Sequence, residues 1–247
     1  MLKALRKTRN KINKFFNSFI NLKDNFYLKK LQNGDYKVTD SLKYYSQFAS
    51  PELVKDILEK RISAKDDPRW QEFGFSKPEE YEFWSWRACG IICIKMIIDT
   101  AWDKNEKIKD LIEEGIKLGG YVSHDKNGNL IDKGWYYKPL INLAKKYNFT
   151  GKVFPHLSIQ NICREILKKH FVVVSVDPGL IRYDEVKSDF KGGHVVLVYG
   201  FKWENKKCMG FYLHNPSGKS EETRKAFIPT DVFKKAFAGR GFSIWKK

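Results

Sequence analysis

The chain has 247 residues, of which 42% are hydrophobic and 15% aromatic, so it can bury a substantial core and is not disordered as a whole. Its formal charge of +17 points to acidic partners, but the lysines are spread along the whole chain, which favours a bias of codon usage over a binding patch. No apolar run is long enough to span a membrane, and the basic N-terminus lacks the apolar core and cleavage site of a signal peptide.

The cysteines indicate a reducing environment. None of them forms a Cys-x-x-Cys pair, and Cys93, Cys163 and Cys208 fall in apolar runs, which is not the usage of a disulfide framework. A zinc site built from Cys89, Cys93 and a histidine would have poor spacing. We therefore expect a cytoplasmic protein with no bound metal and no cofactor.

Residues 1–60 are expected to form a basic helical extension. Residues 1–23 contain lysines and arginines but no acid, with phenylalanine and isoleucine at roughly helical spacing. Such a helix can pack Phe16 and Phe19 on the domain, which we favour, or lie on an anionic surface of membrane or nucleic acid. No specific nucleic acid is expected as a partner.

Two further elements are predicted within this extension. The turn signal Asn33-Gly34 indicates a short hairpin over 26–38. The pattern over 40–62 is that of a helix, with a second start at Ser50-Pro51-Glu52. The rest of the chain, 61–247, is expected to be one domain.

The spacing of apolar residues predicts a succession of helices in the first half of this domain. The helix that begins at Cys89 is apolar around most of its circumference, so we expect it to be buried. The predicted helices cover 78–84, 89–101, 106–118 and 135–147.

After residue 150 the pattern changes to that of strands, interrupted by a helix over 158–170 with Ser158 as its cap. The predicted strands cover 152–154, 171–176, 192–201, 209–214 and 242–245, and a short helix falls near 230–237. Helices that precede strands in this way predict an α+β fold, in which a helical N-terminal half packs on a C-terminal antiparallel sheet.

Three residues in this order indicate nucleophilic chemistry. Cys89 lies in the first turn of a buried helix, where unpaired amides and the helix dipole favour a thiolate. His194 stands at the entrance of a buried strand, and Asn215 ends the neighbouring strand. A cysteine nucleophile needs a base, and the base needs an orienting acceptor, so the three residue types form a working set. His214 should point away from Asn215 and is the weaker candidate for the base.

Several short motifs recur in a recognisable order over residues 66–247. They are Ala88-Cys89-Gly90, Gly119-Gly120-Tyr121, Gly134-Trp135, Gly193-His194-Val195-Val196 and Asn215-Pro216. In this order they resemble the bacteriocin-processing-peptidase-like branch of the papain-like cysteine peptidases (clan CA, family 39). The resemblance implies a papain-like fold, with Cys89 as nucleophile, His194 as general base and Asn215 as the residue that orients the imidazole.

The resemblance also implies an oxyanion hole, which this chain must build differently. Relatives usually supply a glutamine shortly before the cysteine, where this chain has Phe83. A serine hydroxyl or an indole N–H beside the Cys89 amide is the expected substitute, and Gln71 would have to fold back to serve. The residues expected around the oxyanion hole and cleft are Ser85, Trp84, Trp86, Gly90 and Gly193.

The implied function is that of a cysteine peptidase or amidase, which cleaves an amide bond of a peptide or protein through a thioester. Two alternatives would use the same cleft, namely an acyltransferase and a catalytically weak module that binds a peptide or protein. In a third alternative, the protein binds an anionic surface through residues 1–23.

Overall fold

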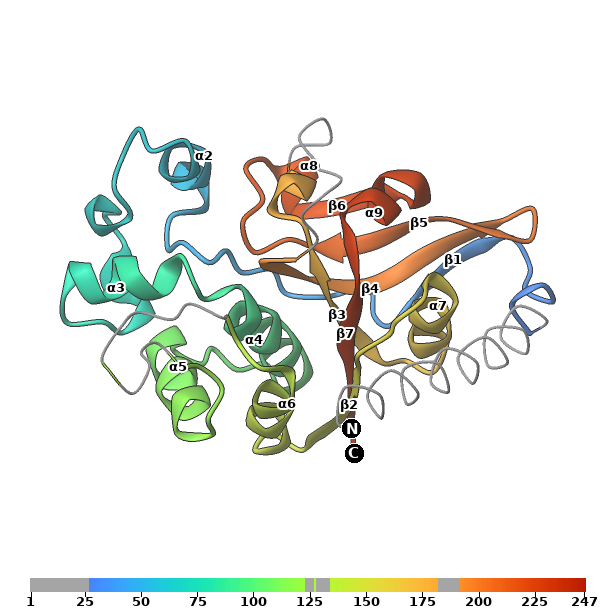
Figure 1. The fold of residues 1–247 in the computed structure, drawn as a ribbon, viewed down its shortest axis with the longest axis horizontal. Coiled ribbons are helices and arrows are strands. Elements are labelled where there is room, and N and C mark those ends of the chain that lie inside the picture. The colour runs from blue at the N-terminus through green and yellow to red at the C-terminus, as the bar shows by residue number, and fades with distance from the viewer. Residues whose placement is uncertain (1–26, 123–126, 128–133, 182–191) are drawn as a thin grey trace.

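The computed structural model describes residues 27–122, 127, 134–181 and 192–247 (Figure 1). The predicted contact of residues 1–23 with the domain or with an anionic surface lies outside these residues. The helices are α2 (Val54–Leu58), α3 (Pro78–Ser85), α4 (Cys89–Trp102), α5 (Ile108–Lys117), α6 (Tyr137–Lys145), α7 (Ile159–Leu167), α8 (Glu221–Arg224) and α9 (Thr230–Ala236). The strands are β1 (Gly34–Lys37), β2 (Phe149–Phe154), β3 (Phe171–Val176), β4 (His194–Glu204), β5 (Lys207–His214), β6 (Lys225–Pro229) and β7 (Phe237–Lys246).

The strands form one antiparallel sheet with the order β2-β7-β3-β4-β5-β6, and β1 pairs with the far half of β4. Helices α2 to α6 gather on one side of this sheet in Figure 1, as the α+β prediction requires. Successive residues of β3 face opposite sides, so that Val173 joins the core under α4 while Val172 and Val174 join a second core under α7 and α9.

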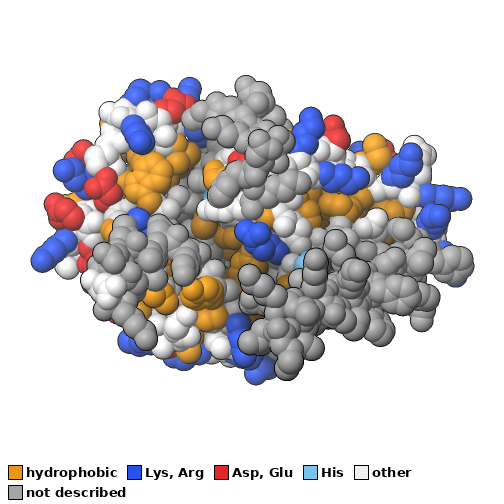
Figure 2. Space-filling view, viewed as in Figure 1, with side chains coloured by type: hydrophobic (Ala, Val, Ile, Leu, Met, Phe, Trp, Pro, Cys, Tyr) orange, Lys and Arg blue, Asp and Glu red, His pale blue; other side chains and the backbone are white. Residues whose placement is uncertain are grey.

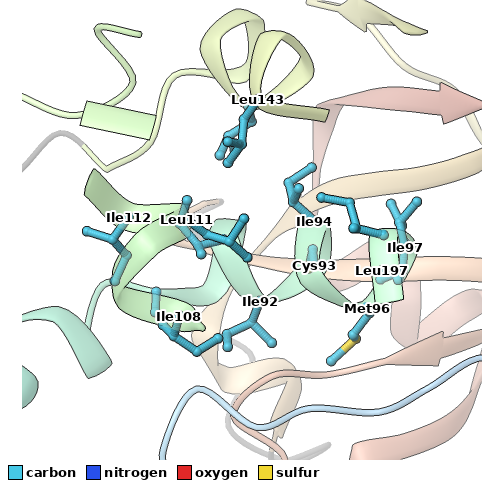
Figure 3. Close-up of a cluster of buried hydrophobic side chains, with 14 of the residues drawn as sticks. Ile92, Cys93, Ile94, Met96, Ile97, Ile108, Leu111, Ile112, Leu143 and Leu197 are labelled. Carbon is cyan, nitrogen blue, oxygen red and sulfur yellow. The ribbon is translucent and has the colours of Figure 1, made fainter. Parts of the chain in front are cut away.

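Helix α4 occupies the centre of the first core. Its residues from Gly90 to Asp99 are all buried, which confirms the prediction of a helix that is apolar around most of its circumference. Figure 3 shows how its side chains meet those of α5, α6 and β4. The labelled members are Ile92, Cys93, Ile94, Met96 and Ile97 of α4 with Ile108, Leu111, Ile112, Leu143 and Leu197. Burial on every side fixes the start of α4, and with it Cys89, relative to the sheet.

Two predictions for the N-terminal part were wrong. The segment 40–62 is helical only over Pro51–Leu58, because the residues before it bond to distant parts of the chain instead of to one another. The Lys43 amide donates to Thr100 Oγ1, at 2.9 Å, and the Ser50 amide to Asp67 Oδ2, at 3.0 Å. The predicted hairpin over 26–38 is also absent from the described residues, because β1 pairs with β4.

The remaining predicted helices and strands of the domain are present with small shifts at their ends. The largest shift is at β7, which begins at Phe237 instead of at residue 242. Helix α7 ends earlier than predicted, at Leu167, and at its start Ser158 and Asn161 form a capping box. Strand β6 and helix α8 were not predicted. Among the described residues, no helix is long and apolar enough to cross a membrane.

Candidate active site

A cavity of about 310 Å³ opens between the start of α4 and the end of the sheet where β4 begins. Cys89 and His194 both line it, so the fold brings together residues that are far apart in the sequence. The other lining residues are Trp86, Arg87, Gly90, Gly134, Trp135, Tyr136, Tyr137, Leu140, Ser175, Gly193, Val195 and Arg240.

Cys89 is the first residue of α4 and is partly exposed to the cavity. The preceding N-cap residue, Ala88, has no side chain that could bond to the first amides of the helix, so these amides and the helix dipole favour negative charge at the sulfur. Cys93 lies one turn further on and is buried, and burial raises the pKa of its thiol well above the usual range. Of these two thiols, only Cys89 meets the cavity.

His194 begins β4 and is buried, with 6% of its surface exposed. Gly192 and Gly193 precede it with φ values of +130° and +89°, a backbone conformation that side chains with a Cβ rarely adopt. The two glycines thus allow the chain to turn sharply into the strand. Burial lowers the pKa of His194 to about 4, although its hydrogen bond to Asn215 acts in the opposite direction.

Asn215 follows the last residue of β5 and hydrogen-bonds to the imidazole of His194. Its Oδ1 lies 2.8 Å from His194 Nε2 and also accepts the Ser217 amide, at 3.1 Å. An oxygen in this position requires that Nε2 carry the proton, which leaves Nδ1 as the basic atom of the ring. Ser217 Oγ lies 3.1 Å from His194 Nε2 and reinforces this arrangement.

The loop that carries Asn215 is held by residues from well before the domain predicted over 61–247. The Tyr44 hydroxyl donates to the Asn215 carbonyl oxygen, at 2.9 Å, and the Gln47 amide donates to the Pro216 carbonyl oxygen, at 2.8 Å. Sequence reasoning missed both Ser217 and Tyr44. A serine two positions after an asparagine is a turn signal that would have pointed to Ser217, whereas no local pattern marks Tyr44.

The structure separates the residues that were expected around the oxyanion hole. Trp86, Gly90 and Gly193 line the cavity, but Trp84 and Ser85 do not. The Ser85 hydroxyl donates within α3 to the Glu82 carbonyl oxygen, at 3.1 Å. Gln71 is exposed and is likewise absent from the cavity lining. Trp86 is therefore the remaining side-chain donor among the predicted ones.

His214, the weaker candidate for the base, lies outside the cavity lining. It is buried with its ring against those of Tyr44 and Tyr199. None of the four cysteines forms a disulfide. Within the part of the chain that the structure describes, no group of three or more His, Cys, Asp or Glu residues is placed to hold a metal ion.

Cys89 at a helix start and the buried His194 line one cavity, and Asn215 hydrogen-bonds to His194, on an α+β scaffold. These residue types in these places are those of papain-like thiol peptidases. Residues 68–244 match the sequence profile of the Peptidase_C39 like family, and the chain belongs to that family. This confirms the resemblance seen in the motifs and supports a function of the cysteine-peptidase kind. No curated protein sequence matches the chain significantly.

Three solved structures are similar to this one at low identity. The peptidase domain of Streptococcus ComA, a bifunctional ABC transporter of a quorum-sensing pathway, shares 14% identity, with 65% of this chain and 93% of that chain covered and a TM-score of 0.42. A C39-like peptidase from Bacillus anthracis, described as putative, shares 17% identity, with 65% and 90% covered and a TM-score of 0.45. A double-glycine-motif protease from a PCAT transporter, solved with its leader peptide, shares 15% identity, with 64% and 84% covered and a TM-score of 0.38. The family assignment rests on the sequence match and not on these likenesses.

Proposed function

We propose that the protein is a cysteine peptidase in which Cys89 is the nucleophile, His194 the general base and Asn215 the residue that orients the imidazole. The observation that carries the proposal is the hydrogen bond of 2.8 Å between His194 Nε2 and Asn215 Oδ1 beside a cavity that Cys89 also lines. A neutral imidazole whose Nε2–H is held by a carboxamide keeps Nδ1 free to accept a proton, as a general base beside a nucleophile must.

In the proposed reaction, His194 is neutral near pH 7 because burial lowers its pKa to about 4. Nδ1 accepts the Cys89 thiol proton, and the resulting thiolate and imidazolium stabilise each other. The sulfur attacks the amide carbon, and the tetrahedral intermediate collapses as His194 returns the proton to the leaving amine. Water then hydrolyses the thioester with His194 as base, which releases the acid product and restores the thiol.

The developing oxyanion requires donors, and we assign them to the Cys89 backbone amide and the Trp86 indole N–H. Trp86 lines the cavity and follows directly on α3, three residues before the nucleophile. Its ring meets that of Phe48 edge to face, with 5.4 Å between the centroids, which holds the indole in place. Removal of one oxyanion donor typically lowers the rate by about 10²–10³-fold.

The proposed substrate is a peptide or protein, and the proposed location is the cytoplasm, as the cysteine pattern of the sequence predicts. The test is to incubate the chain with a diverse peptide mixture and to identify products by mass spectrometry. Cys89→Ala should abolish cleavage, and Cys208→Ala, which removes a partly exposed thiol outside the cavity lining, should retain it.

Cleavage that persists in Cys89→Ala would overturn the assignment of the nucleophile. If no peptide is cleaved and acid quenching traps no acyl adduct on Cys89, the protein is the non-catalytic binding module instead. Transfer of the acyl group to an added amine in place of water would favour the acyltransferase.

A further inference from the structure

Arg240 reaches the cavity because the pairing of β3 with β7 is irregular. Val174 pairs with Gly241, but Val176 pairs with Phe237, so that the single residue Ser175 faces a bulge of three residues on β7. Bulges of this kind bend a strand and redirect its side chains. Here the bulge ends with Arg240, an exposed residue that lines the same cavity as Cys89 and His194.

The guanidinium of Arg240 lies directly over Gly192, just before His194. A Cβ on Gly192 would be 2.4 Å from Arg240 Nη2 and 3.5 Å from Ser175 Oγ, so the guanidinium occupies the space that any other residue would fill. The arginine fork and the serine hydroxyl therefore flank one point at the sheet side of the cavity. Figure 2 shows basic side chains and the pale blue of a histidine together near the middle of this face, between the helical half and the sheet.

Among the described residues, the charged side chains that line the cavity are all of one sign. They are Arg87 and Arg240, with no aspartate or glutamate among the described lining residues. Arg87 is held on the helical side by bonds to the Phe83 carbonyl oxygen and the Tyr121 hydroxyl. Arg240 forms no ion pair with any carboxylate in the described part of the chain, so its planar fork is available to an anion.

The position of Arg240 defines which end of a substrate it would meet. It lies on the sheet side, with Ser175 between it and the start of β4, whereas the Cys89 helix forms the opposite wall. His194 must face the leaving amine in order to protonate it, so the product that leaves first extends over the sheet side. Arg240 is on β7, which lies two strands away from β4 and His194. Two strand spacings of about 4.8 Å each are spanned by about three residues of extended peptide.

We propose that Arg240, together with Ser175, binds a carboxylate of the substrate within about three residues after the cleaved bond. The inference rests on the proposed peptidase function and names its substrate class, peptides that are acidic on the leaving side. The carboxylate can belong to an aspartate or glutamate side chain or to a free C-terminus close to the cleaved bond. Both present the same group to the guanidinium, and the peptide experiment below separates them.

The first test uses the alkylation of Cys89 and needs no turnover. Iodoacetate carries a carboxylate and iodoacetamide does not, and both react with the same thiolate, so the ratio of their rates at Cys89 cancels any change in the thiolate fraction. Arg240→Gln should lower the iodoacetate-to-iodoacetamide ratio by at least about threefold, because a nearby positive charge is lost. Lys235→Gln, an exposed position on α9, is the control for net charge and should leave the ratio unchanged.

The second test compares peptides that differ only in charge on the leaving side. One set of peptide pairs has glutamate or glutamine at each of the three positions after the cleaved bond. A further pair has a free or an amidated C-terminus. Comparison within the pairs identifies the source of the carboxylate. In one pair, kcat/KM should be about tenfold higher for the acidic peptide than for its neutral partner. Arg240→Gln should bring the ratio of these two kcat/KM values close to one. Arg240→Lys should keep the alkylation ratio and lose much of the peptide preference, because it retains the charge but not the fork.

The carboxylate site and the peptidase function can each be contradicted without the other. If no peptide is cleaved, the proposed peptidase function fails while the alkylation ratio still reports on Arg240. If the alkylation ratio is the same in Arg240→Gln and Lys235→Gln, or if peptides are cleaved without regard to charge, the carboxylate site is overturned and the peptidase function stands.

Discussion

Asn215 accepts hydrogen bonds on one side-chain oxygen from His194 and from the Ser217 amide. Asn215→Ala removes the group that fixes the ring of His194, and the misplaced base should lower kcat/KM for peptide cleavage by about 10²-fold. Ser217→Ala should cost much less, because the Ser217 backbone amide and Asn215 itself remain. The measurement is steady-state kinetics of both variants on one peptide.

The two variants also discriminate between a positioning role and a merely structural one. If Asn215→Ala and Ser217→Ala lose equal activity and equal thermal stability, Asn215 only holds the loop together. Loss of activity in Asn215→Ala at unchanged melting temperature supports its role on the imidazole.

The histidines predict how stability depends on pH. Burial lowers the pKa of His194 and of His214 from 6.5 to about 4, and Lys225 contributes at His214. The unfolded chain therefore binds more protons between pH 6.5 and pH 4, so the stabilisation is complete above pH 6.5 and is lost as the pH falls through that window. Each histidine accounts for a loss of at most about 3 kcal/mol in the free energy of unfolding over this window.

Urea unfolding at pH 7 and pH 4.5 measures this loss of free energy. His214→Phe, which keeps a ring between Tyr44 and Tyr199, should reduce the difference between the two pH values. An unchanged difference in this variant would show that His214 is not buried in its neutral form.

At the residue scale, helix starts and strand ends are visible in the apolar pattern, so the sequence could indicate that Cys89 and His194 meet at one cavity and that Asn215 lies beside His194. Their catalytic roles stay a prediction. The motifs were not sufficient for Arg240 or Tyr44. Arg240 reaches the cavity through a bulge in strand pairing, and Tyr44 contacts Asn215 across the fold, so neither contact has a local signature.

Among the elements, the start of α4 depends on how Trp135 packs. The Trp135 indole donates to the Arg87 carbonyl oxygen, at 2.9 Å, just ahead of Cys89. Its ring lies against Gly115 of α5, where a Cβ would be only 2.7 Å from Trp135 Cζ3. Close contact between α5 and this ring thus requires a glycine.

Gly115→Ala should push Trp135 away and cost about 1–3 kcal/mol of unfolding free energy, the usual range for overpacking. It should also slow the alkylation of Cys89, since the Arg87 carbonyl loses its donor. Glu113→Ala, an exposed change on the same helix, is the control in denaturant unfolding and labelling. Equal stability of the two variants would contradict the packing argument.

The elements that sequence reasoning predicted well are those whose own faces are buried, such as α4 and β3. It failed where distant contacts decide the structure. Residues 41–50 satisfy backbone groups through Thr100, Asp67 and Pro216 instead of forming a helix. Strand β6 escaped notice because it is a short strand at the edge of the sheet that ends in Pro229.

For the whole molecule, the position of residues 27–60 raises a question about the predicted domain boundary at residue 61. Leu28, Phe48, Val54 and Ile57 are almost completely buried in the two cores, and β1 pairs with β4. Figure 1 shows this blue N-terminal part running along the sheet and into the helical half. We infer that the segment stabilises the domain.

Deletion of residues 1–60 should therefore abolish or strongly weaken cooperative unfolding, because it exposes both cores and removes the donors to the Asn215 loop. Thermal unfolding followed by circular dichroism measures the effect against the full chain. A truncated chain that unfolds cooperatively at the temperature of the full chain would support an independent domain over 61–247.

The central claim, that His194 activates Cys89, is tested most directly by the rate of Cys89 alkylation with iodoacetamide at pH 6. An activated thiolate should react at least about tenfold faster than free cysteine, whose thiol is almost fully protonated at this pH, and His194→Ala should remove the advantage. A Cys89 that reacts no faster than free cysteine, at a rate that His194→Ala leaves unchanged, would contradict the account.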